Sequence, residues 1–185
     1  MKVKELKLKG SFLISPKIIC DNRGYFFESY SKKKLNNILE QKIDFVQDNQ
    51  SKSKKGVIRG FHFQKQPYAQ GKLIRAQVGK IFDVIIDIRK ESETYGEFDS
   101  VIISSSNKLM LWIPPGFAHG FQSMTNNAVI IYKTSNYYHK ESEVSINPFD
   151  SEIGVTWPID SLNISLKDKT GIDFKIVKKD KLFYV

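Results

Sequence analysis

The chain has 185 residues, of which 41% are hydrophobic and 12% aromatic, and this apolar content excludes a disordered protein. The length suits one domain with a single core, because two full domains would be cramped in it. The net charge of +9 comes mostly from lysines spread along the chain, which is more typical of a solvated surface than of a nucleic-acid-binding face. We therefore predict no nucleic-acid partner, and an anionic small-molecule substrate fits the charge equally well.

The sequence shows neither a membrane-spanning segment nor an export signal. Its apolar runs fall short of the roughly 20 residues that cross a bilayer, and the first ten residues lack a signal-peptide core. The single cysteine, Cys20, cannot form an internal disulfide, which agrees with a reducing compartment. We expect a cytoplasmic protein that does not associate with a membrane.

The first clear element in chain order is a helix over residues 31–41. Ser31 can cap its N-terminus, and Leu35, Ile38 and Leu39 fall on one face. This apolar face is expected to pack against the strands that follow.

From residue 73 onward the chain reads as short β-rich runs separated by turn residues. The expected strands cover residues 73–78, 80–88, 100–104, 109–113 and 128–134. Regular short strands of this kind predict an all-β sandwich or barrel. A parallel sheet with a dinucleotide site is disfavoured, and the absence of a P-loop motif excludes P-loop nucleotide hydrolysis.

The strand pattern weakens after Trp157-Pro158, where Lys and Asp mix with sparse apolar residues. We interpret residues of about 159–185 as a C-terminal extension of a single domain that covers residues 1–185. No repeat or linker divides the chain.

His62 is the first candidate catalytic residue. Strand alternation, if unbroken by a bulge, puts Gly60, His62 and Gln64 on one face. A histidine that only packs in the core or lies on the surface is the plainer alternative. Arg59 and Lys72 stand nearby in sequence, so a base and two cations could gather around an anionic ligand. Histidine is the natural general base near neutral pH.

His119 follows the rigid turn Pro114-Pro115-Gly116, which could present its side chain at the mouth of a barrel or use it only to tie down a corner. Two histidines in a β-barrel also invite a metal, which needs three or four ligands. Gln64 stands where a second ligand of a His-x-His pair would be, and no nearby acidic residue completes a set. We predict no metal and no other cofactor.

A tyrosine could act as the proton donor opposite a histidine base. The candidates are Tyr132, Tyr137 and Tyr138, each of which could equally be a packing residue. Tyr132 lies in an apolar strand that could bury its ring while its hydroxyl points into a cavity.

Several long motifs in one order resemble the dTDP-4-dehydrorhamnose 3,5-epimerase family across nearly the whole chain. The motifs that carry the resemblance are Asp21-Asn-Arg-Gly-Tyr-Phe-Phe-Glu28, Phe45-Val-Gln-Asp-Asn-Gln-Ser51, Gly56-Val-Ile-Arg-Gly-Phe-His-Phe-Gln64, Gln70-Gly-Lys-Leu-Ile-Arg75, Phe82-Asp-Val-Ile-Ile-Asp-Ile-Arg89, Trp112-Ile-Pro-Pro-Gly-Phe-Ala-His-Gly-Phe121 and Gly154-Val-Thr-Trp-Pro158. The resemblance implies a cupin-type jelly-roll of antiparallel sheets with a few short helices and without a metal. It also implies a homodimer in which an N-terminal segment completes the neighbour's site.

The resemblance further implies roles for individual residues. His62 is similar to the family's general base, Asp168 to the carboxylate that orients it, Tyr132 to the acid on the opposite face, and Lys72 to the cation that stabilises an enolate. Asp160 and Asp173 are possible substitutes for Asp168. Residues that match positions holding the sugar nucleotide are Arg23, Glu28, Gln47, Asp48, Asn49, Arg59, Lys72, His119, Tyr138, Glu143 and Lys167. The resemblance implies that Arg23 and Glu28 serve the partner subunit and that Tyr138 packs by the sugar.

The predicted activity is inversion of C3 and C5 of dTDP-4-dehydro-6-deoxy-D-glucose to give dTDP-4-dehydro-L-rhamnose, a step toward dTDP-L-rhamnose. Two alternatives stay open. One is an epimerase that acts at a single carbon of a related 4-keto deoxysugar nucleotide, and the other is a barrel that only binds a sugar nucleotide.

Overall fold

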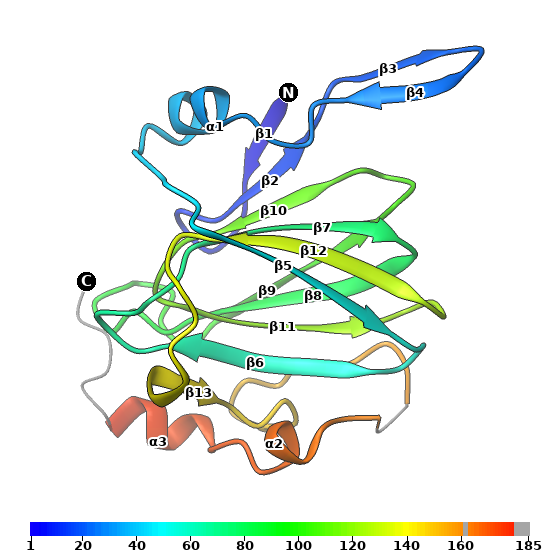
Figure 1. Ribbon diagram of the computed structural model, residues 1–185. Coiled ribbons are helices and arrows are strands. Elements are labelled where there is room, and N and C mark those ends of the chain that lie inside the picture. Colours follow the sequence, from blue (N-terminus) through cyan, green and yellow to red (C-terminus); the bar gives the residue numbers. More distant parts are fainter. Residues whose placement is uncertain (161–162, 180–185) are drawn as a thin grey trace.

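The computed structural model describes residues 1–160 and 163–179 and places most strands in two facing antiparallel sheets (Figure 1). The six-stranded sheet has the order β1 (Lys2–Glu5), β2 (Phe12–Ser15), β10 (Met110–Ile113), β7 (Lys72–Val78), β12 (Ala128–Thr134) and β5 (Gln47–Ser53). The five-stranded sheet has the order β13 (Glu143–Ser145), β6 (Ile58–Gln64), β11 (Phe117–Ser123), β8 (Lys80–Asp87) and β9 (Phe98–Ser104). This is the antiparallel, cupin-like jelly-roll that the sequence predicted.

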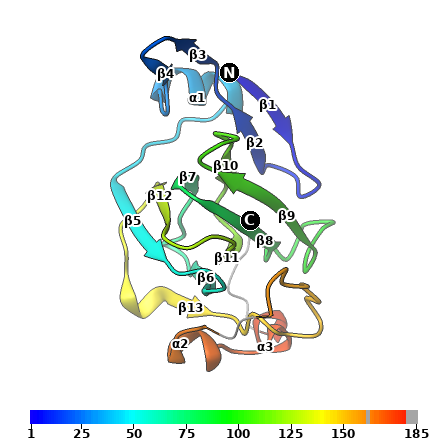
Figure 2. The same ribbon diagram turned by 90° about the vertical axis from the view of Figure 1, so that its right-hand side faces the viewer.

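Short helices and a two-stranded ribbon flank the sheets (Figure 2). The ribbon, which pairs β3 (Ile18–Asp21) with β4 (Gly24–Phe27), lies on the same side of the sandwich as α1 (Lys32–Leu39). A 3-10 turn, η1 (Lys140–Ser142), precedes β13, and α2 (Leu166–Lys169) and α3 (Phe174–Lys179) lie on the opposite side from α1. None of the helices in the described part of the chain has the length and apolar character needed to cross a bilayer.

Apolar side chains fill three layers. The central layer lies between the sheets and includes Ile74 and Ile130 from one sheet and Ile85 and Phe121 from the other. The outer face of the six-stranded sheet is covered by α1, whose Leu35 joins the third cluster of buried residues. Burial of these side chains is the main favourable contribution to the folding free energy.

The C-terminal segment covers the outer face of the five-stranded sheet. Phe174 and Val177 of α3 are buried against Phe61 and Phe63 of β6 and their neighbours. The prediction of an extension over residues 159–185 did not anticipate this packing, because two well-spaced apolar residues among lysines do not reveal a buried face. Residues 161–162 and 180–185 of that extension lie outside the described residues, and the single-domain organisation stays a prediction.

The five predicted strands are confirmed as β7, β8, β9, β10 and β12, with bounds that differ by at most two residues. The predicted helix is also confirmed, because Ser31 caps α1 by accepting a hydrogen bond from the Lys34 N–H. His119 follows the turn of Pro114, Pro115 and Gly116, as expected. It is the third residue of β11, a strand that the sequence did not predict, and it lines the cavity between the sheets.

Candidate functional site

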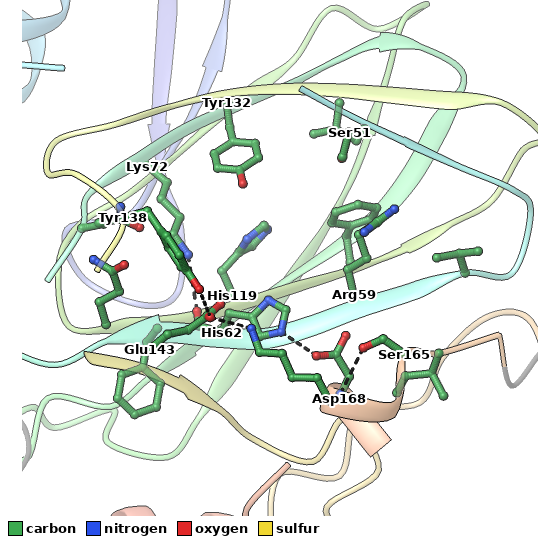
Figure 3. A pocket seen from close by; sticks show the side chains of 18 of the residues that line it. Ser51, Arg59, His62, Lys72, His119, Tyr132, Tyr138, Glu143, Ser165 and Asp168 are labelled. Carbon is green, nitrogen blue, oxygen red and sulfur yellow. Dashed lines mark hydrogen bonds and ion pairs between the residues drawn. The ribbon is translucent and has the colours of Figure 1, made fainter. Parts of the chain in front are cut away.

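A cavity of about 590 Å³ lies between the two sheets, on the side of the edge strands β5 and β13 and of β6 next to β13 (Figure 3). It contains side chains that the sequence marked as candidates from five different strands and from the C-terminal segment. The candidates that line the cavity are Arg59, His62, Lys72, His119, Tyr132, Tyr138, Glu143, Lys167 and Asp168. Other lining residues include Ser51, Gln64, Gln70, Phe121, Ile130, Asn163 and Ser165.

An irregularity in β6 brings Arg59 and His62 to the same cavity although they are three residues apart. His119 of β11 pairs with His62, but Phe121 pairs with Arg59, so β6 contains one extra residue between these pairs. The extra residue is accommodated at Gly60, whose φ is +117° and where a Cβ atom would lie 2.5 Å from the Gly120 Cα. The predicted unbroken alternation is wrong at this point.

His62 is hydrogen-bonded to a buried carboxylate. Its Nε2 lies 2.6 Å from Asp168 Oδ1, and Asp168 is only 3% exposed. The same carboxylate accepts hydrogen bonds from Ser145 Oγ at 3.1 Å and from the Gly60 N–H at 3.3 Å. Burial opposes ionisation of Asp168, but the bonds from His62, Gly60 and Ser145 outweigh it and lower its pKa. An ionised Asp168 accepts a hydrogen bond from the Nε2–H group of His62, so the Nδ1 lone pair of His62 is free to take a proton.

Of the three aspartates that were candidates for orienting His62, Asp168 is the one that contacts it. Ser165 caps α2 by accepting a hydrogen bond from the Asp168 N–H at 3.1 Å, which fixes the start of this short helix beside β6. Asp173 instead pairs with Lys175 at 3.2 Å, and Asp160 is exposed. The structure therefore brings Asp168 to the base and leaves both substitutes elsewhere.

Lys72 lies in the same cavity as His62, and its Nζ donates to the His62 carbonyl oxygen at 3.4 Å. Burial lowers the pKa of Lys72 to about 8, while the nearby charges of Glu143 and Asp83 act in the opposite direction. The side chain thus remains mostly charged at neutral pH and becomes neutral in the mildly alkaline range.

His119 forms a second histidine–carboxylate pair. Its Nε2 lies 2.9 Å from Oδ1 of Asp83, which is fully buried. Burial lowers the pKa of His119 despite the charge of Asp83, and the positive charges of Lys72 and His62 lower it further. His119 is therefore expected to be a neutral polar group in the cavity wall.

Tyr132 faces His62 from the other sheet. Tyr132 and Lys72 belong to the six-stranded sheet, whereas His62 and His119 belong to the five-stranded sheet. The Tyr132 hydroxyl points into the space between them (Figure 3). Burial raises the pKa of Tyr132, although Arg59 acts in the opposite direction, so the hydroxyl keeps its proton at neutral pH. A ligand in this cavity would thus have a base on one side and a proton donor on the other.

Glu143 joins two further candidates at the mouth of the cavity. Its Oε2 accepts a hydrogen bond from the Tyr138 hydroxyl at 2.8 Å and forms an ion pair with Lys167 Nζ at 2.6 Å. Burial opposes the ionisation of Glu143, but these two partners outweigh it and lower its pKa. The third tyrosine candidate, Tyr137, is exposed over 64% of its surface and is not among the lining residues.

Five predicted binding residues lie outside the cavity lining. Gln47 and Asn49 are close to it, since Gln47 bonds to Asn49 at 2.8 Å and accepts a hydrogen bond from the Tyr138 N–H. Asp48 has the opposite orientation in β5 and pairs with Lys133 at 2.8 Å. The remaining two, Arg23 and Glu28, belong to the N-terminal ribbon and its end, where they pair with Asp21 and Lys34.

Sequence reasoning missed several residues that support the site. Asp83 is the carboxylate that pairs with His119, and Ser145 donates a hydrogen bond to Asp168, the partner of His62. Ser51 and Gln70 line the cavity. A signal for Asp83 was present, because a carboxylate flanked by apolar residues in the strand of residues 80–88 has to find a buried partner. The serines and Gln70 carry no comparable signal, since such residues are common on any surface.

The described residues contain no group of three or more His, Cys, Asp or Glu side chains that could hold a metal. In the cavity, each of the two histidines is paired with a single carboxylate. The prediction that the site needs no metal stays a prediction, which treatment with a chelator tests.

Comparison with known proteins agrees with the architecture and with the motifs. The family model described as dTDP-4-dehydrorhamnose 3,5-epimerase matches residues 5–175. A dTDP-4-dehydrorhamnose 3,5-epimerase from Salmonella typhimurium is 50% identical over 169 residues, which cover 91% of this chain and 92% of the relative. The enzyme of the same name from Shigella flexneri is 45% identical over 174 residues, covering 94% and 96%.

A solved structure is similar over the full length. The crystal structure of dTDP-6-deoxy-D-glucose-3,5-epimerase from Legionella pneumophila, in complex with dTDP-4-keto-L-rhamnose, has a TM-score of 0.95 and 39% sequence identity. The match covers 100% of this chain and 98% of that one. Because the family model matches residues 5–175, which are most of the chain, the chain belongs to the dTDP-4-dehydrorhamnose 3,5-epimerase family.

Proposed function

We propose that this protein inverts C3 and C5 of dTDP-4-dehydro-6-deoxy-D-glucose and so produces dTDP-4-dehydro-L-rhamnose. The observation that carries the proposal is the position of His62 and Tyr132 on opposing sheets of one cavity, with Lys72 beside them. Inversion of a carbon requires removal of a proton from one face and delivery of a proton to the other. The two opposed walls provide these two functions.

The reaction begins at a C–H bond next to the C4 carbonyl. The Nδ1 lone pair of His62 takes the proton, and the electron pair of the broken bond moves into the carbonyl to form an enolate. Asp168, hydrogen-bonded at Nε2, balances the charge of the resulting imidazolium. The Lys72 ammonium stabilises the enolate oxygen, a type of contribution that is worth about 3 kcal/mol.

Reprotonation completes the inversion. Tyr132 donates its hydroxyl proton to the carbanionic carbon from the face opposite His62, and the enolate collapses to the ketone. Tyr132 is left deprotonated and His62 protonated, so proton exchange with solvent restores the starting state. Because C3 and C5 both adjoin C4, one enolate-stabilising group can serve both inversions in succession.

The cations of the cavity suit the diphosphate of a sugar nucleotide. Arg59 and Lys167 line the cavity together with Lys72, and guanidinium and ammonium groups bind phosphate oxygens. The Arg59 side chain is held by hydrogen bonds from its Nε to Ser53 Oγ at 3.1 Å and from Nη2 to the Lys52 carbonyl. This anchoring favours a fixed binding position for an anionic group.

We further propose that the protein acts as a cytoplasmic homodimer. The ribbon of β3 and β4 projects away from the sheets (Figure 1) and exposes Ile19 and Phe26 over 55% and 68% of their surfaces. Exposed apolar residues on a projecting ribbon favour a contact with another subunit. In that arrangement Arg23 and Glu28 would reach the partner's cavity, as the family resemblance implies.

Solvent isotope exchange tests the proposed function. Incubation of the substrate with the protein in D2O should place deuterium at both C3 and C5, which NMR resolves. Deuterium at one carbon only would identify a single-carbon epimerase. Its absence from both carbons, with binding retained, would leave only sugar-nucleotide binding.

The Tyr132→Phe substitution tests the acid on the opposite wall. Phenylalanine keeps the buried ring but has no proton to deliver, so completed inversion should fall about 100-fold or more. Removal of the substrate proton by His62 should be affected less. The comparison of product formation with loss of the substrate deuteron, starting from substrate labelled at C3 and C5, measures this difference. Equal losses in the two rates would contradict the assignment.

Metal removal gives a separate prediction. Prolonged treatment with EDTA should leave the exchange rate unchanged, because the proposed steps use only protein side chains. An activity that EDTA removes and a divalent metal restores would contradict this prediction.

A further inference from the structure

The amide of Gln64 connects two loops at the mouth of the cavity. Gln64 lies two residues after His62 on β6 and is only 5% exposed. Its Nε2 donates to the carbonyl oxygens of Tyr68 at 2.6 Å and Tyr137 at 3.1 Å, and its Oε1 accepts from the His139 N–H at 2.8 Å. Both amide donors and the acceptor are thus engaged with backbone groups.

These bonds hold the two peptide groups that flank Tyr138. Gln64 binds the carbonyl of the residue before it and the N–H of the residue after it. Two other glutamines hold the same segment by one bond each, since Gln47 accepts from the Tyr138 N–H at 3.2 Å and Gln70 donates to the Asn136 carbonyl at 2.8 Å. Gln64 is the most buried of the three and the one that also reaches the loop of Tyr68.

The position of the Tyr138 ring depends on this backbone anchor. Tyr138 lines the cavity but is 54% exposed, so its ring is only partly enclosed by protein. Its hydroxyl bonds to Glu143, which is the residue directly opposite Gln64 in the β13–β6 pair. The backbone bonds and the hydroxyl bond of Tyr138 thus start from two paired positions of neighbouring strands, Gln64 of β6 and Glu143 of β13.

We propose that Gln64 is a positioning residue for substrate binding and acts by holding Tyr138 at the cavity mouth. The inference rests on the proposed function, in which Tyr138 packs beside the sugar. Removal of the amide leaves two carbonyl groups and one N–H without their partner, and buried backbone groups in that state favour rearrangement of the loop. His62 and Lys72 are held by other contacts and keep their places.

The Gln64→Met substitution tests this role, because methionine has similar length and flexibility but no amide. We expect KM for the sugar nucleotide to rise about tenfold with kcat changed less than about twofold, the pattern of lost binding rather than lost chemistry. In the free protein, hydrogen exchange at the Tyr138 and His139 amides should accelerate. Where the methionine variant does not fold, Gln64→Glu, which keeps the acceptor and loses both donors, serves the same comparison.

Gln122→Met is the matched control. Gln122 is also a buried strand glutamine, and it bonds both the carbonyl and the N–H of Ile159, away from Tyr138. The Gln122→Met substitution should lower the free energy of unfolding without raising KM. In a Tyr138→Ala background, Gln64→Met should add little to KM, since both changes act through one ring.

Several outcomes would overturn the positioning role: unchanged KM, equal effects of both glutamine variants, or additive effects with Tyr138→Ala. The hydrogen-exchange measurement uses no substrate, so unaltered exchange refutes the role of Gln64 whatever the activity is. An inactive wild-type protein would instead refute the proposed function.

Discussion

The His62→Ala protein is expected to lose deuterium incorporation at C3 and C5 by about 100-fold to 10,000-fold, the usual contribution of a positioned general base. The cause is local, because the substitution removes the group whose Nδ1 takes the proton and leaves the walls of the cavity in place. The measurement is the initial rate of exchange in D2O, followed by NMR at both carbons.

Two comparisons separate loss of the base from loss of the fold. Binding of dTDP and a cooperative unfolding transition should be retained, while the unfolding temperature falls, because Asp168 keeps its bonds from Gly60 and Ser145 but loses its partner His62. Asp168→Asn should give an intermediate rate, because the imidazole remains without the charge that stabilises its protonated form. Wild-type exchange in the His62→Ala protein would show that another group is the base.

Lys72→Met is expected to reduce the epimerisation rate about 100-fold to 1,000-fold while stabilising the fold. The loss of rate follows from removal of the cation beside the enolate oxygen. The gain in stability follows from burial, which lowers the pKa of Lys72 from its ordinary value of 10.5 to about 8. That difference corresponds to a penalty of roughly 3 kcal/mol at pH 7, which methionine does not incur.

The contribution of Lys72 to the free energy of unfolding should depend on pH. Below pH 8 both folded and unfolded chains hold the Lys72 proton, so the penalty is fully present. Between about pH 8 and 10.5 the unfolded chain retains a proton that the folded chain has released, so the contribution to the free energy of unfolding rises with pH. The advantage of Lys72→Met in urea unfolding should therefore shrink across this window. A difference that does not vary with pH would contradict the buried, charged lysine.

The same pKa predicts the alkaline limb of the wild-type rate. As the pH rises through about 8, Lys72 of the free protein loses its charge and with it the stabilisation of the enolate, so kcat/KM should fall. An alkaline limb that persists in Lys72→Met would assign the limb to another group.

Much of the candidate site followed from sequence motifs. His62, Lys72 and Tyr132 were expected in one cavity and lie in one, because each occupies a strand whose alternation turns it inward. Asp48 had a family match but faces away from the cavity to pair with Lys133, which a single residue's identity could not show. The sequence placed Gln64 on the same strand face as His62, where it is not a metal ligand, and gave no sign of the three bonds that its amide forms with backbone groups of two loops.

By itself, the sequence determined the class of fold, five of the six strands between residues 72 and 134, the helix after Ser31 and the residue types available for proton transfer. These are local properties, since turn residues, alternation and caps act within a few positions of one another. The tertiary structure decided which distant groups meet. Asp168 reaches His62 across 106 positions, and Asp83 reaches His119 across 36. Such pairs depend on strand order and register, which arise from the packing of the whole sandwich and leave no periodic trace in the chain.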